Sequence, residues 1–197
     1  SFEGSKIINQ SSAQDVATGI LAAKSSGVIE RVFIDNNSMI FGSDNTGALV
    51  GIGSGATIRL CESESFVQGQ KNVGGLVGHL DGPEEYASTE EFPAMSVIVN
   101  SLSLGSVGGN ENIGGLVGKN NGLIAYSYSA GNVSGYKNIG GLVGYIDVRD
   151  ISIINSFSSS SVSGELNKAG LIGMNTQLSS TNAITENVWH LSNNCYN

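Results

Sequence analysis

A short glycine-rich motif recurs along the chain, and this repetition constrains the fold more than any other feature. Three full copies are Asn72–Gly78 (NVGGLVG), Asn112–Gly118 (NIGGLVG) and Asn138–Gly144 (NIGGLVG). Weaker copies are GALVG at 47–51, AGLIG at 169–173 and a decayed GILAA at 19–23. The central leucines, spaced 28, 27, 40, 26 and 29 residues apart, are Leu21, Leu49, Leu76, Leu116, Leu142 and Leu171. A fixed period of this length indicates a stack of repeated structural units.

Each copy is followed by a second, looser pattern that is typical of short strands. Ile124–Tyr128 (IAYSY) leads to Val133, and Ile153–Phe157 (IINSF) leads to Val162. These segments are too short and too β-branched for helices, and Gly, Asn and Ser separate them at turn spacing. The same leucine at the same phase in every copy favours a solenoid, in which each coil repeats the environment of the last. We therefore predict an all-β parallel β-helix, or β-solenoid, of about six coils with 26–29 residues each.

The pattern of large and small residues predicts which side chains face inward. The residues two before and two after each leucine are almost all Gly or Ala, which suits a narrow interior with the leucines stacked inside it. The position three before the leucine holds Lys168 in one copy, so we expect it at the rim or exterior. Ala48 and Ala169 replace glycines, so smallness rather than positive φ explains most motif glycines. Those closing the motif are better candidates for a turn: Gly78, Gly118, Gly144 and Gly173.

One small slot of the second pattern holds Cys61 in one coil and a serine in the others, namely Ser101, Ser127 and Ser156. A buried small thiol is the expected role of Cys61.

The GGLVG motif followed by Ile-x-Asn-Ser-Tyr/Phe resembles the GLUG-motif repeats of bacterial surface proteins. The resemblance covers roughly residues 19–189. Such repeats occur in filamentous-haemagglutinin-like adhesins and in non-catalytic regions of IgA-specific metallopeptidases. The resemblance implies an extracellular or cell-surface location and brings no catalytic residues, because the family is defined by scaffold glycines and core aliphatics.

Composition narrows the function classes. The formal net charge is −8 with 9 basic residues, which makes nucleic-acid binding a poor expectation. No apolar run reaches transmembrane length, so we expect no membrane insertion. The chain has no initiating Met or signal peptide, and we interpret it as a piece of a larger protein with flanking domains. Within it we expect an N-terminal flank or cap over 1–18, repeats over 19–183 and a degraded C-terminal coil or cap over 184–197.

No catalytic signature and no cofactor motif occurs, so a non-enzymatic role is expected, without a cofactor. The enzymatic alternative is a β-helix carbohydrate-active enzyme, which would need acidic pairs or basic residues clustered on one face of successive coils. The preferred function is a repeat module of an extracellular bacterial adhesin, acting in surface attachment or ligand binding and as a rigid spacer. A non-catalytic region of a secreted IgA-type metallopeptidase is the alternative. A host surface glycan or protein is the expected partner.

The third coil is 40 residues long, and its excess forms an acidic insertion over about 80–95. Insertions in solenoids protrude and often carry binding function, although a simple solvated loop explains the charge as well. The candidate ligand-binding residues at this insertion are His79, Asp81, Glu84, Glu85, Glu90 and Glu91. We expect a calcium ion to bind at Asp81, Glu84 and Glu85 if their carboxylate oxygens converge.

Overall fold

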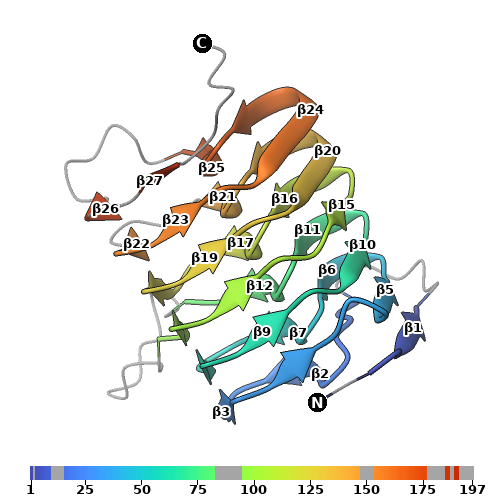
Figure 1. Ribbon diagram of the computed structural model, residues 1–197. Coiled ribbons are helices and arrows are strands. Elements are labelled where there is room, and N and C mark those ends of the chain that lie inside the picture. The colour runs from blue at the N-terminus through green and yellow to red at the C-terminus, as the bar shows by residue number, and fades with distance from the viewer. Residues whose placement is uncertain are drawn as a thin grey trace.

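The computed structural model is an all-β solenoid of about five turns, in which short parallel strands stack coil upon coil (Figure 1). It describes residues 1, 3–9, 16–82, 95–146, 153–176, 185–186 and 189–190. The predicted parallel β-helix is confirmed. Six strands in a stack bound five complete turns, which is why six leucine copies correspond to about five turns.

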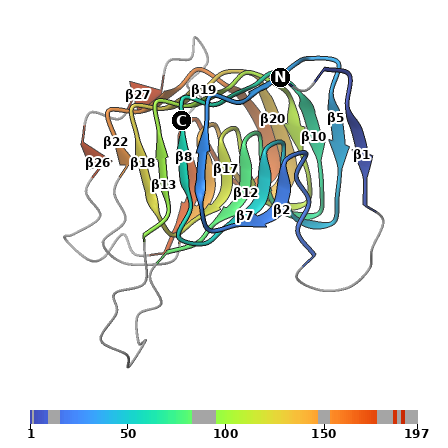
Figure 2. The same ribbon diagram turned by 90° about the horizontal axis from the view of Figure 1, so that it is seen from below.

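Three faces of the solenoid are six-stranded sheets (Figure 2). The β2 sheet contains β2 (Ala22–Ser25), β7 (Val50–Gly53), β12 (Val77–Leu80), β17 (Val117–Asn120), β21 (Val143–Ile146) and β25 (Ile172–Asn175). The β3 sheet contains β3 (Val28–Glu30), β8 (Thr57–Arg59), β13 (Val97–Val99), β18 (Leu123–Ala125), β22 (Ile153–Ile154) and β26 (Thr185–Glu186). The β4 sheet contains β4 (Phe33–Ile34), β9 (Glu62–Ser63), β14 (Leu102–Ser103), β19 (Tyr128–Ser129), β23 (Phe157–Ser158) and β27 (Trp189–His190).

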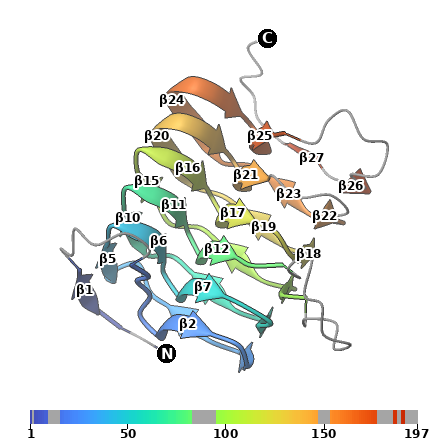
Figure 3. The same cartoon turned by 180° about the vertical axis from the view of Figure 1, so that it is seen from behind.

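A nine-stranded sheet closes each coil. Its first part contains β1 (Lys6–Ile8), β5 (Met39–Phe41), β10 (Phe66–Gln68) and β15 (Val107–Gly108). Its second part contains β6 (Asp44–Gly47), β11 (Lys71–Gly74) and β16 (Glu111–Gly114). The long strands β20 (Asn132–Gly140) and β24 (Ser161–Ala169) continue through both parts, because β20 pairs with β15 and with β16. Figure 3 shows the second part beside the β2 sheet along the whole stack.

The predicted leucine stack forms the centre of the core. Leu49, Leu76, Leu116 and Leu142 are fully buried, and each donates its backbone N–H to the leucine carbonyl of the next coil, for example Leu116 N to Leu142 O at 2.9 Å. Each leucine lies at the corner before a strand of the β2 sheet, so the valine that follows it also faces inward. Leu21, in the first coil, is 42% exposed because no coil covers it on one side in the described residues.

One expectation about the core is wrong. The position three before the leucine is buried in the central coils, where it holds Val73, Ile113 and Ile139 at 0% exposure. These side chains lie on β11, β16 and β20 and point into the same interior as the leucines. Lys168 is exposed because it lies on β24, at the edge of its sheet, where the aliphatic environment ends.

The glycines that close the motif are not turn residues, which corrects the second expectation. Gly118 is the second residue of β17, and none of the motif glycines has a positive φ. A Cβ at Gly118 would lie 2.4 Å from both Asn72 C and Val73 N of the preceding coil. The close approach of two backbones therefore explains why Gly118 is a glycine. Small size, which the sequence predicted for the other motif glycines, is the reason here as well.

We expect Gly118→Ala to destabilise the fold by roughly 3 kcal/mol or more, because backbone atoms that meet the new methyl group have no side-chain freedom with which to relax. Gly27→Ala is the matched control, since a Cβ there has no atom within 4 Å. Urea denaturation followed by the β-sheet circular dichroism band measures both changes. Equal midpoints for the two variants would contradict the close approach.

The small-residue slot of the second pattern is a serine ladder that begins with Cys61. The backbone N–H of Cys61 donates to Ser101 Oγ at 3.2 Å, and the same contact joins Ser101 to Ser127 and Ser127 to Ser156. Cys61 is 1% exposed, and burial raises the pKa of its thiol. The expected small buried thiol is confirmed.

Candidate functional site

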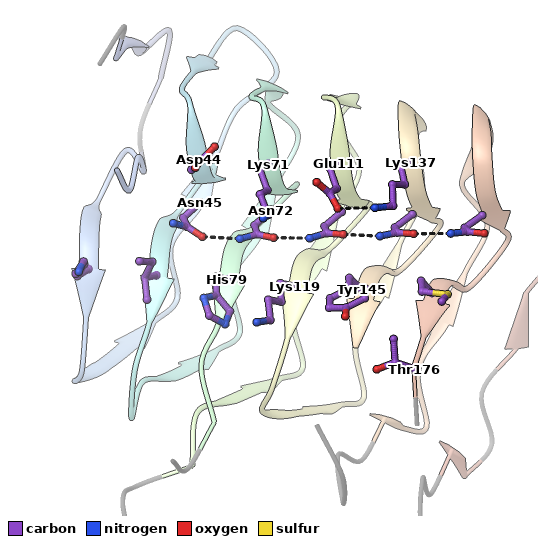
Figure 4. A pocket seen from close by; sticks show the side chains of 16 residues that line it. Asp44, Asn45, Lys71, Asn72, His79, Glu111, Lys119, Lys137, Tyr145 and Thr176 are labelled. Carbon is purple, nitrogen blue, oxygen red and sulfur yellow. Dashed lines mark hydrogen bonds and ion pairs between the residues drawn. The ribbon is translucent and has the colours of Figure 1, made fainter. Parts of the chain in front are cut away.

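A groove of about 690 Å³ runs along the outside of the stack, between the β2 sheet and the second part of the nine-stranded sheet (Figure 4). Its floor and its two walls each take one side chain from successive coils. The floor residues are Asn45, Asn72, Asn112, Asn138 and Asn167. We call this surface the asparagine groove. It crosses every strand of both walls, so it presents the same positions again at each coil.

The floor is a hydrogen-bonded ladder of amides. Asn72 Nδ2 donates to Asn45 Oδ1, and the same 2.8 Å bond joins each later asparagine to the one before it. All five have a φ between 47° and 59°, the left-handed region that Asn tolerates better than most residues. The ladder uses one N–H and one acceptor position of each interior amide, and a primary amide has two of each.

The wall formed by β6, β11, β16 and β20 alternates in charge. Asp44, Lys71, Glu111 and Lys137 occupy matching positions on these four neighbouring strands. Lys137 Nζ lies 3.0 Å from Glu111 Oε1. Because neighbouring parallel strands are about 4.8 Å apart, the two lysines recur at intervals of about 10 Å with a carboxylate between them.

The opposite wall belongs to the β2 sheet and is more varied. The matching positions along it hold Lys24, Ile52, His79, Lys119, Tyr145 and Met174. The Tyr145 side chain is half-buried and offers a flat apolar surface beside the polar floor. Such a mixture suits a ligand with both hydroxyl groups and apolar faces.

Positive charge gathers in the groove. Four lysines line it against two carboxylates, Asp44 and Glu111, a formal charge of +2 in a chain whose formal net charge is −8. The rest of the chain is therefore strongly acidic, and the groove is a local exception to that field.

The structure places only part of the predicted acidic site. His79 lies on β12 inside the groove, and its Nε2 is 4.0 Å from Asp81 Oδ1. Asp81 follows the strand, accepts hydrogen bonds from Gly82 N and Ser54 Oγ, and is partly exposed. Glu84, Glu85, Glu90 and Glu91 lie outside the described residues, so the binding and calcium hypotheses for the insertion stay predictions. Within the described ranges, no three metal-ligating side chains gather closely enough to hold an ion.

Sequence reasoning did not predict the groove or the role of its asparagines. The signal was present, because an asparagine stands four residues before the leucine in five of the six copies. An amide that keeps one phase through such a repeat, next to glycines, is typical of a side-chain ladder. The alternating wall had no comparable signal, since each of its residues differs from the one in the next coil.

Comparison of the chain with protein-family models, curated proteins and solved structures gave no match to any of them. Among the residues that the structure describes, there is no helix long and apolar enough to cross a membrane. The class of the protein is thus defined by its architecture, a parallel β-solenoid with an asparagine-floored groove, and the GLUG resemblance stays a prediction.

Proposed function

We propose that this chain is a non-catalytic binding module of a larger extracellular bacterial surface protein, an adhesin of the GLUG-repeat type, and that the asparagine groove holds its ligand. The observation that carries the proposal is the continuous groove, preformed across five coils with a polar floor, one charged wall and one wall of mixed polar and apolar residues. The same role would suit a non-catalytic region of a secreted IgA-type metallopeptidase.

An extended polymer is the ligand shape that the groove favours. The binding positions repeat once per coil along a line, and a compact small molecule would contact only two or three of them. Host surface polymers of this shape are glycans and extended protein segments.

The inner wall strands cannot take a peptide by strand addition. β12 is hydrogen-bonded to β7 and β17, and β16 to β11 and β20, so the inner strands of both walls have no free edge. Recognition must use side chains. A peptide advances about 3.3 Å per residue against about 4.8 Å per coil, so its groups would drift out of phase with the amides. A pyranose unit in an extended polysaccharide advances about as far as one coil, which favours a glycan.

The arrangement of acids favours binding over hydrolysis. Asp44 and Glu111 are separated by β11, about 10 Å between strand positions. Glu111 is occupied by Lys137, and Lys71 stands between the two acids. Glycosidases need two carboxyl groups that flank one bond without a cation between them, one of them able to donate a proton. A wall in which acids and lysines alternate can orient a ligand, but its acids are poorly placed for acid–base catalysis.

Tyr145→Ala is the test of the groove. We expect roughly tenfold weaker binding to an immobilised host polysaccharide, because truncation removes the aromatic contact from one wall of the site. A panel of hyaluronan, keratan sulfate, dextran and fibronectin, measured by biolayer interferometry, provides the probes. Tyr126→Ala is the matched control, since Tyr126 is 59% exposed and lies outside the groove.

The melting temperature of both variants separates binding from folding. Equal binding by the two tyrosine variants to every member of the panel that the parent binds would place the binding surface elsewhere. No binding of the parent chain to any member would favour a spacer role.

A further inference from the structure

The first groove wall has two lysines at a defined separation. Lys71 and Lys137 occupy equivalent positions two strands apart, about 10 Å along the stack. That interval equals roughly two sugar units of an extended polysaccharide. A ligand that lies along the wall would therefore meet two cations that are two sugars apart.

The carboxylates of the same wall occupy the positions in between. Asp44 and Glu111 are in register with the lysines, so they would face the remaining sugars. A polymer with an anionic group on every sugar would place half of its charges against these acids, and like charges at short range repel. The wall thus selects against uniform polyanions as well as for an alternating one.

The net negative charge of the whole chain increases this selectivity among anionic polymers. The acidic exterior repels anions, while the groove has an excess of lysines over carboxylates. Only an anion that matches the lysine positions would gain enough local attraction to offset that repulsion. The uncharged sugars of the polymer would lie over the amide floor and beside Tyr145, where hydroxyl and acetamido groups meet donors and acceptors.

We propose that the ligand of the asparagine groove is a polysaccharide of alternating sugars with one anionic group, carboxylate or sulfate, on every second unit. This inference rests on the proposed binding function and adds the chemical class and charge spacing of the ligand. Lys71 and Lys137 bind the anions, with Lys137 exchanging its ion pair with Glu111 for one with the ligand, and the released Glu111 carboxylate excludes polymers that are charged on every unit.

Matched polymers test the charge requirement. The probes are hyaluronan, which has one carboxylate per disaccharide, its methyl ester, which has the same backbone without charge, and polygalacturonate, which is charged on every sugar. We expect hyaluronan to bind at least tenfold more tightly than either of the others, and its binding to weaken as salt rises from about 0.1 M to about 1 M. Keratan sulfate, which has sulfates and no uronate, distinguishes sulfate from carboxylate as the preferred anion.

Two sets of variants test the residues. Lys71→Gln with Lys137→Gln should lower hyaluronan binding at least tenfold. Lys6→Gln with Lys168→Gln, the same charge change on exposed lysines outside the groove, should leave it within twofold. Glu111→Gln should raise polygalacturonate binding severalfold, whereas Glu165→Gln at the exposed surface of β24 should not.

The outcomes separate this inference from the proposed function. Equal binding of hyaluronan and its methyl ester, lost in Tyr145→Ala, would leave the groove as a glycan site and overturn the charge spacing. Binding of fibronectin alone, lost in Tyr145→Ala, would do the same in favour of a protein ligand. Polysaccharide binding that no groove variant changes would overturn both.

Discussion

Leu116→Ala is expected to lower the free energy of unfolding by about 2–5 kcal/mol, the range for a buried leucine whose removal leaves a cavity. Leu116 is fully buried, with Leu76 and Leu142 stacked on either side of it. The narrow interior between glycine-lined backbones has little freedom to collapse, since the backbones of neighbouring coils already touch at Gly78 and Gly118. The upper part of the range is therefore the expected result.

Leu166→Ala makes the same chemical change at a side chain that is 47% exposed on β24, and should shift stability by no more than about 0.5 kcal/mol. Chemical denaturation monitored by circular dichroism compares the two variants. A loss at Leu116 no larger than that at Leu166 would show that the leucine stack does not carry the core.

Asn112→Ala should be at least as damaging as the core truncation, at about 3–8 kcal/mol. Two ladder bonds disappear, and the buried Asn72 and Asn138 amides each lose a partner, at about 1–3 kcal/mol for each unsatisfied group. Alanine at a φ of 59° adds about 1–2 kcal/mol of backbone strain. The measurement is again the midpoint of chemical denaturation.

Two further variants separate these causes. Asn112→Gly keeps the left-handed backbone and removes only the amide, so it should recover about 1 kcal/mol relative to Asn112→Ala. Asn100→Ala tests the backbone alone, because Asn100 has a φ of 50° with an exposed side chain outside the ladder. If Asn112→Ala and Asn100→Ala were equally destabilising, the ladder bonds would contribute nothing measurable.

The sequence predicted the parts of the fold that every coil repeats. Leu76, Leu116 and Leu142 occupy one phase, and a solenoid is the architecture that gives one phase one environment. The prediction failed where one atypical coil was taken as representative. Lys168 lies at a sheet edge, and its charge says nothing about Ile113 and Ile139 in the middle of the stack.

The groove could be predicted only in part. The asparagines were visible at a constant phase, and their hydrogen bonding follows once the coils are known to stack in register. The wall depends on which residues of different coils become neighbours, and the long third coil hides that register. Lys71 and Glu111 are 40 residues apart in the chain, yet they occupy paired positions on adjacent strands.

Because the amide ladder repeats once per coil, the number of contacts with a polymer ligand depends on the number of coils. Each of the four middle coils contributes one amide and one residue from each wall. In a solenoid each coil packs only against its neighbours, so a middle coil can be duplicated or deleted while the others keep their internal packing. A duplication would lengthen the groove by one step and let the same polymer make one more set of contacts. Avidity could thus be tuned by gene length alone, since each added contact forms within a complex that already exists. Variation among related chains would then appear first in copy number and only later in sequence.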